Sequence, residues 1–151
     1  ILVGEMRDEE TIGLAVRAAE MGVLVFGTLH TNNAVKTVDR LVDAFPANRQ
    51  AQVRLSLSES LEAVVAQLLL RTMDGKRCAA NEILLRTSAL PNIIREGKTP
   101  QLKSLIEGGK ALGMQSMDDA LEILVRAGKV DPNDAYAKAQ DKARFDRLQE
   151  R

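Results

Sequence analysis

Two short apolar runs, each followed by a helical pattern, constrain the fold of this chain most strongly. The first run is Ile1 to Val3 and the second is Val23 to Leu29. Such runs are typical of strands buried on both faces, as in the sheets of α/β proteins. A buried strand needs neighbours on both sides. We therefore expect the chain to be part of a longer protein, cut at or just before a core strand.

The segments between and after these runs predict helices and a hairpin. Asp8 to Gly22 has an acidic first turn, which suits the positive end of a helix, and a glycine at its stop. A second helix, capped by Asn32 or Asn33, runs to Phe45, just before Pro46. A third helix is predicted from about Asn48 to about Ala66, and a hairpin follows with Asp74-Gly75 as its turn.

After Arg86 the strand patterns stop and only helices are predicted. Helix-capping residues mark the starts and stops of these segments. Ser88 would cap a short helix ended by Gly97, Pro100 to Glu107 would form another, Ser116 and Asp119 would form a capping box for Met117 to Ala127, and Asp131 would cap a last helix. The chain thus divides into an α/β part, residues 1–86, and a small all-α part, residues 87–151.

Composition excludes several classes of function. Lys plus Arg equals Asp plus Glu, 21 each, so no basic excess indicates nucleic acid or a membrane surface. Aromatic residues make up only 3%, and the longest apolar runs are far shorter than a membrane span. Cys78 is the only cysteine. A disulfide framework is therefore excluded, and a cytosolic setting is expected.

The first apolar run ends in an acidic residue, which is the form of a Walker B element. In such elements a carboxylate at the carboxyl end of a strand polarises water or holds Mg²⁺ beside a nucleotide. The usual pattern places Asp before Glu, whereas here Gly4 takes the Asp position and Glu5 remains. The alternative is that Glu5 is a surface residue at a strand end with no chemical role.

The second run ends in "GTLHT", which contains His30, the only histidine of the chain. Ligands of open α/β sheets bind at the carboxyl ends of the strands, so His30 is expected on the same edge as Glu5. An imidazole can donate to a phosphate oxygen, and the hydroxyls of Thr28 and Thr31 can add donors. The alternative is a structural histidine. A metal site is not expected, because zinc needs a cluster of His and Cys.

The tripeptide Gly97 to Thr99, "GKT", has the form of the end of a phosphate-binding loop. Such a loop needs another glycine five residues before Gly97, where this chain has Asn92. No other stretch fits the pattern. The chain therefore lacks a phosphate cradle of its own.

Together, "ILVGEMRD", "LVFGTLHTNNAVKTVDRLVDAFP" and "ALPNIIRE" followed by "LGMQSMDDAL" resemble the type IV pilus retraction ATPases. These are the PilT-type motors of twitching motility, in the type II/IV secretion ATPase superfamily. The resemblance implies that residues 1–86 are the C-terminal part of a RecA-like P-loop ATPase core. Residues 87–151 would be its helical C-terminal domain. The PAS-like domain, Walker A loop, acidic "Asp box" and arginine fingers of the family would precede this chain.

The resemblance also implies roles for residues and partners. Glu5 corresponds to the catalytic glutamate, and His30 corresponds to the His-box residue that approaches the γ-phosphate. Gly4, Thr28 and Thr31 would lie against the nucleotide. The expected cofactors are ATP and Mg²⁺, with no metal site of the chain's own. The expected assembly is a cytoplasmic homohexamer, peripheral at the inner membrane, that works with the platform protein of the pilus machine.

"ALPNIIRE" resembles a helix that the family needs for retraction and not for hydrolysis. Six residues of this retraction motif are present, and Pro91 replaces an arginine of the family pattern. The six residues are Ala89, Asn92, Ile93, Ile94, Arg95 and Glu96.

Two other readings remain open. A pilus-assembly or type II secretion ATPase is a close relative, but such proteins usually carry a four-cysteine zinc module that a lone Cys78 cannot form. A non-catalytic helical adaptor or DNA-binding module would fit residues 87–151. That reading lacks a basic stripe and leaves the strand motifs unexplained.

Overall fold

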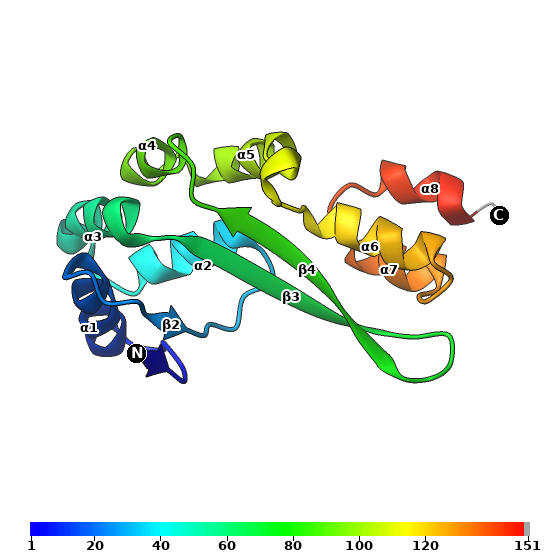
Figure 1. The fold of residues 1–151 in the computed structure, drawn as a ribbon, viewed down its shortest axis with the longest axis horizontal. Coiled ribbons are helices and arrows are strands. Elements are labelled where there is room, and N and C mark those ends of the chain that lie inside the picture. The colour runs from blue at the N-terminus through cyan, green and yellow to red at the C-terminus, as the bar shows by residue number, and fades with distance from the viewer. Residues whose placement is uncertain (150–151) are drawn as a thin grey trace.

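A long β-hairpin runs through the molecule and connects two groups of helices (Figure 1). The computed structural model describes residues 1–149. At one end of the hairpin lie α1, α2 and α3 with two short strands, and at the other end lie α6, α7 and α8. The elements are β1 Leu2–Val3, α1 Glu9–Glu20, β2 Phe26–Gly27, α2 Ala34–Asp43, α3 Ala47–Ser60, β3 Ala63–Arg71, β4 Arg77–Leu85, α4 Leu90–Arg95, η1 Thr99–Gln101, α5 Leu102–Gly108, η2 Lys110–Leu112, α6 Met117–Arg126, α7 Pro132–Lys138 and α8 Ala143–Gln149.

The two strands β1 and β2 pair in parallel, with Leu2 opposite Phe26 and Val3 opposite Gly27. The prediction that they are buried strands is wrong for the chain as described. Leu2 is 75% exposed and Phe26 is 61% exposed, and each strand is only two residues long. The physical reason is that this sheet has two strands in the described part of the chain. Within residues 1–149, no third strand pairs with this sheet, and the side chains of Leu2 and Phe26 are left uncovered.

The hairpin β3–β4 is antiparallel over nine residue pairs, from Ala63 opposite Leu85 to Arg71 opposite Arg77. Its turn contains Gly75 with a φ of 82°, as the sequence predicted. The prediction that helix α3 continues to Ala66 is wrong, because α3 ends at Ser60. The exposure of residues 63–66 alternates, with Val64 and Ala66 buried, which is the two-residue period of a strand.

Most helix ends lie where the capping residues predict them. Asp8, Asn33, Ser116 and Asp131 each accept a hydrogen bond from a backbone N–H in the first turn of the helix that follows. The prediction of a cap at Ser88 is wrong, since α4 begins after Ala89 without a side-chain cap.

The last predicted helix is two helices. The backbone becomes extended at Ala139, with φ −61° and ψ 144°, which ends α7. Helix α8 then begins at Ala143 and returns along α7, with Phe145 fully buried. Asp118 binds the backbone of the turn between the two helices, a long-range contact that helical spacing in the sequence cannot indicate.

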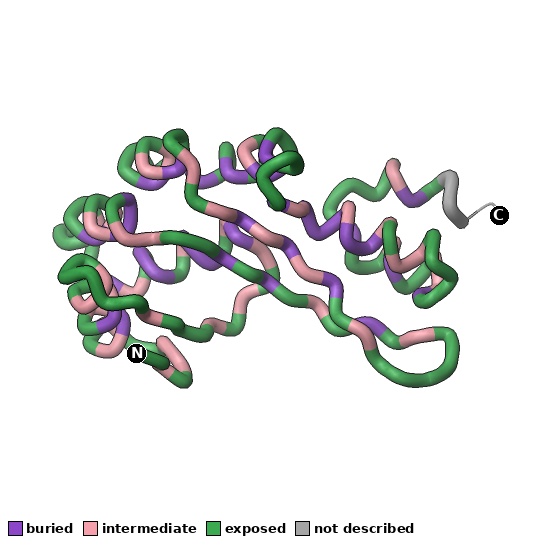
Figure 2. Tube along the Cα trace, in the orientation of Figure 1, coloured by how far each residue is buried: buried purple, intermediate pink, exposed green. Residues whose placement is uncertain are grey.

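The buried residues, coloured purple in Figure 2, include two hydrophobic cores. Helices α4 and α5, which follow Arg86, pack into the first core, while Leu70 and Ala80 of the hairpin belong to the second core, so the cores do not divide at Arg86 as the predicted domains do. That domain boundary stays a prediction. The larger members of the first core include Ile12, Val38, Leu57, Leu84, Ile94 and Leu102. Those of the second include Leu70, Met117, Leu121, Val130 and Phe145.

Candidate functional site

The carboxyl ends of β1 and β2 bring Glu5 and His30 together. Parallel pairing continues past the strands through a hydrogen bond from Met6 N–H to the carbonyl of Thr28, at 2.9 Å. The segments that follow β1 and β2 therefore leave the sheet at the same edge. His30 Nε2 lies 2.9 Å from Glu5 Oε1. The side chain of His30 is 82% exposed, so it is not a core histidine.

The side chain of Arg7 also contacts Glu5. Its Nε pairs with the same oxygen, Oε1, that faces His30. The hydrogen bond from Arg7 is the largest cause that lowers the pKa of Glu5; partial desolvation opposes it, and the charge of Arg7 adds to it. The same pair raises the pKa of Arg7. Glu5 is therefore a partly buried carboxylate that is ionised at neutral pH, the form that can accept a proton.

The two threonines of the edge already use their hydroxyl protons. Thr28 Oγ1 donates to the carbonyl of Gly4. Thr37 Oγ1 donates to the carbonyl of Asn33 at 2.8 Å, so its 2.8 Å contact with Thr31 has Thr31 as the donor. Each hydroxyl has one proton. In this conformation the Thr28 proton joins the two strand ends and the Thr31 proton lies in the turn into α2, and the expected role of both residues beside a nucleotide stays a prediction.

Gly4 stands in open space at the edge. A Cβ at this position would meet no atom within 4 Å in the described residues. An Asp at this position, as in the usual Walker B pattern, would thus be compatible with this backbone. The glycine is not required by packing here, and its expected role beside a nucleotide stays a prediction.

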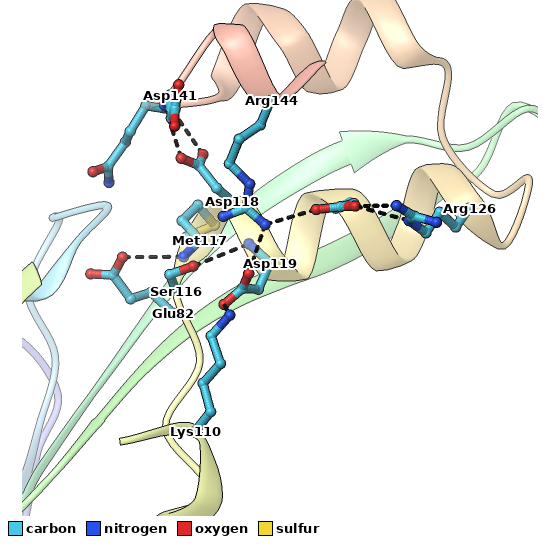
Figure 3. Close-up of polar contacts among 11 residues, drawn as sticks. Glu82, Lys110, Ser116, Met117, Asp118, Asp119, Arg126, Asp141 and Arg144 are labelled. Carbon is cyan, nitrogen blue, oxygen red and sulfur yellow. Dashed lines mark hydrogen bonds and ion pairs between the residues drawn. The ribbon is translucent and has the colours of Figure 1, made fainter. Parts of the chain in front are cut away.

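The motif "LGMQSMDDAL" forms an ion-pair network at the start of α6 (Figure 3). Asp119 lies 2.8 Å from Lys110 and 2.7 Å from Arg144. Burial raises the pKa of Asp119, but hydrogen bonds from Lys110, Arg144 and Ser116 outweigh it, so the pKa lies well below the usual range. Arg144 also lies 2.7 Å from Glu122, and it ties α8 to α6 through both carboxylates.

Two buried carboxylates, Glu82 and Asp118, were missed by the sequence analysis. Glu82, 6% exposed, accepts backbone N–H bonds from Ala34 at the start of α2 and from Met117 at the start of α6. Asp118, 4% exposed, accepts bonds from the N–H groups of residues 140 and 141. The alternation of strand residues could have indicated that Glu82 is buried. It lies two residues from Ala80 and two from Leu84, so all three side chains point to the same, inward face of β4.

A family model for type II/IV secretion system proteins matches residues 1–145. The chain belongs to this family.

Among its relatives, a twitching motility protein of Neisseria gonorrhoeae is 57% identical over 142 residues, covering 93% of this chain and 38% of the relative. The type IV pilus retraction ATPase PilT of Pseudomonas aeruginosa is 54% identical over 140 residues, with 93% and 41% covered. A crystal structure of the retraction motor PilT with bound ADP superposes with a TM-score of 0.85 at 44% identity, covering 97% of this chain and 41% of that one. The chain thus spans about two fifths of the relatives it matches.

The fold of this secretion-family chain is therefore the α/β ATPase fold that the sequence predicted. Its site supplies only part of what a nucleotide needs. A single carboxylate, Glu5, faces the edge, and the described residues contain no group of three His, Cys, Asp or Glu side chains that could hold a metal ion. Mg²⁺ in nucleotide sites is commonly held by one or two carboxylates, water and phosphates, so Glu5 fits one such position.

The retraction motif occupies α4 and the residue on either side of it. Leu90 and Ile94 are buried in the first core and hold α4 against α3. Pro91 lies in the first turn, where no intrahelical bond is lost. The polar residues of the predicted retraction motif are exposed, so this segment presents a polar face to solvent. These residues are Asn92, Arg95 and Glu96.

Proposed function

We propose that this chain is the Walker B and His-box portion of an ATP-hydrolysing motor subunit that drives type IV pilus retraction and twitching motility. The observation that carries the proposal is the pair of Glu5 and His30 at 2.9 Å on the carboxyl edge of two parallel strands. The identity to twitching motility and PilT proteins, 57% and 54%, supports the same function.

In this proposal Glu5 is the general base that orients and polarises the attacking water. Its carboxylate is ionised at neutral pH, and loss of the hydrogen bond from Arg7, which lowers its pKa, would make it a stronger base. His30, exposed beside Glu5, donates to the γ-phosphate and reports its presence. Arg7 holds the carboxylate in place. When bound, Mg²⁺ would neutralise charge on the ATP phosphates, and Glu5 is the carboxylate that the β1 strand end would offer to it.

The phosphate cradle would come from the part of the parent protein that this chain does not include, since no Gly-rich loop of that type occurs in the sequence. The proposed assembly is a cytoplasmic homohexamer at the inner membrane. It would work with the platform protein of the pilus machine, and the residues of α4 would serve retraction and not hydrolysis. Within the described residues, no helix has both the length and the apolar character needed to cross a bilayer.

The test is Glu5→Gln in the full-length parent protein. Glutamine keeps the shape and a hydrogen-bond acceptor but cannot take a proton, so we expect ATP hydrolysis to fall roughly 10²- to 10⁴-fold. ATP affinity should stay close to that of the wild type. Glu10→Gln, an exposed carboxylate of the adjacent helix α1, is the matched control and should hydrolyse ATP normally. Wild-type turnover in Glu5→Gln would contradict the proposal.

A further inference from the structure

Glu82 joins two helices that lie far apart in the sequence. Its Oε1 accepts from Ala34 N–H at 2.8 Å, and its Oε2 accepts from Met117 N–H at 3.2 Å. These partners are 48 and 35 positions away along the chain. In the described part of the chain no Lys or Arg lies within ion-pair distance of this buried carboxylate. Its charge is therefore balanced by the N-termini of α2 and α6.

The first of these helices, α2, is connected directly to the proposed nucleotide edge. Only three residues separate His30 from Ala34. This turn is held by the hydrogen bonds from Thr31 to Thr37 and from Thr37 to the carbonyl of Asn33, while the Asn33 side chain caps Lys36 N–H. Because these bonds fix the turn to the helix, a displacement of His30 would move the N-terminus of α2.

The second helix, α6, is bound to the helices that follow it, α7 and α8. Asp118 binds the turn before α8, and Arg144 pairs with Asp119 and Glu122. Figure 3 shows Glu82 directed at the first turn of α6, beside Ser116. The three helices α6, α7 and α8 share the second core, so they are expected to move together.

We propose that Glu82 is a positioning residue that couples the segment carrying His30 to the unit formed by α6, α7 and α8. Both carboxylate oxygens are occupied, one by each helix. If one N-terminus moved alone, a buried charged oxygen would lose its partner, which is unfavourable. The two helices therefore move as a pair. The inference rests on the proposed function, since it assigns to that function the route by which a nucleotide at His30 acts on the helical unit.

The test is amide hydrogen exchange of the full-length parent protein, with ADP and with a non-hydrolysable ATP analogue. In the wild type the exchange rate of the first-turn amides of α6, residues 117–119, should differ roughly tenfold between the two nucleotides, because the displacement that Glu82 transmits from α2 strains the first turn of α6 in one of the two states. In Glu82→Gln this difference should be lost, because the amide NH₂ meets one of the two backbone donors instead of accepting from it.

Asp118→Asn is the matched control. It makes the same change in a carboxylate of similar burial that accepts two backbone N–H bonds, but both donors lie inside the helical unit. It should keep the nucleotide-dependent difference at residues 117–119. Equal loss of the difference in both variants would mean a general loosening of α6 and would overturn the coupling role.

His30→Ala is a second test variant that leaves Glu82 intact. It tests the coupling even if Glu82→Gln does not fold. It should abolish the nucleotide-dependent difference in α6 while ATP still binds. A wild-type protein that hydrolyses ATP but shows no difference in α6, or a His30→Ala variant that keeps it, would overturn the coupling. A parent protein that does not hydrolyse ATP would instead overturn the proposed function.

Discussion

At the scale of single residues, the chemistry of the candidate site depends on which side chains can donate a hydrogen bond to a ligand and which can accept one. Glu5 Oε1 faces both Arg7 and His30, whereas the hydroxyls of Thr28 and Thr31 donate within the chain. The edge therefore offers an acceptor and an imidazole, with no free threonine donor. A ligand that needs hydroxyl donors would first have to break the bond from Thr28 to Gly4 or the bond from Thr31 to Thr37.

The first residue-scale prediction concerns the charge of Glu5. The hydrogen bond from Arg7 lowers the pKa of Glu5 from its usual 4.5. Removing that partner in Arg7→Met should raise the pKa of Glu5, so that its carboxylate is protonated at a higher pH than in the wild type. Carboxyl NMR chemical shifts followed through a pH titration measure this directly. Arg17→Met, in the last turn of α1, should leave the titration of Glu5 unchanged, and an equal shift in both variants would refute the local pairing.

At the scale of elements, the N-terminus of α2 is where the edge joins the first core. Asn33 caps Lys36 N–H at 2.8 Å, whereas the neighbouring Asn32 is exposed. Asn33→Ala should therefore lower the free energy of unfolding of this chain by about 1 kcal/mol. Asn32→Ala should change it by less than about 0.5 kcal/mol, as for other surface substitutions. Urea unfolding of the two variants tests this, and equal effects would mean that the cap contributes nothing.

The helical unit α6 to α8 should be sensitive to acid. The pKa values of Asp119 and Glu122 lie below their usual 3.8 and 4.5, because Lys110 and Arg144 bind Asp119, and Arg144 and Arg126 bind Glu122. Groups with a lowered pKa in the folded state stabilise it at pH values above the unfolded pKa, and this contribution is lost as the pH falls. The stability of the second core should thus decrease as the pH drops below about 4.5.

Tyr136 provides the measurement for this acid sensitivity. It is the only tyrosine, the chain has no tryptophan, and its side chain packs against the second core. Its fluorescence during thermal unfolding should show a lower midpoint at pH 3 than at pH 6, with pH 3 chosen as roughly one unit or more below the usual pKa of Glu. Arg144→Gln should weaken this pH dependence, whereas Lys103→Gln, in α5 of the other core, should not. A pH-independent midpoint in the wild type would contradict the assignment.

At the scale of the whole molecule, two cores share one hairpin, and the polar edge belongs to a sheet of two exposed strands. Strands with exposed apolar side chains and unpaired edges readily associate with further chain. The edge therefore holds the chemical groups but not the enclosure that a nucleotide site requires.

We accordingly predict that the 151-residue chain alone does not bind MgATP tightly. One or two hydrogen bonds contribute about 0.5–1.5 kcal/mol each, whereas micromolar affinity requires roughly 8 kcal/mol. Calorimetric titration of MgATP into the chain should show no saturable site, and the full-length parent serves as the positive control. A site tighter than about 100 μM, roughly 5.5 kcal/mol, would show that the chain contains a phosphate cradle of its own.

The sequence by itself determined the features that depend on neighbouring residues. Side-chain caps at Asn33 and Ser116 and the turn at Gly75 were predictable, because a cap or a tight turn is decided by a few adjacent positions. The strand ends also predicted that Glu5 and His30 share an edge, since parallel strands place their carboxyl ends together.

Only the tertiary structure decided the contacts between distant segments. Helix α3 stops at Ser60 because Val64 and Ala66 pair with β4, although Val64 also continues the helical spacing of Val53, Leu57 and Leu61. Glu82 accepts from α2 and α6, and Asp118 from the turn before α8, at sequence separations that no local pattern encodes. Burial of a carboxylate is favourable only where folding brings donors to it from elsewhere. Residues of this kind are therefore identified from the folded chain and not from their neighbours in sequence.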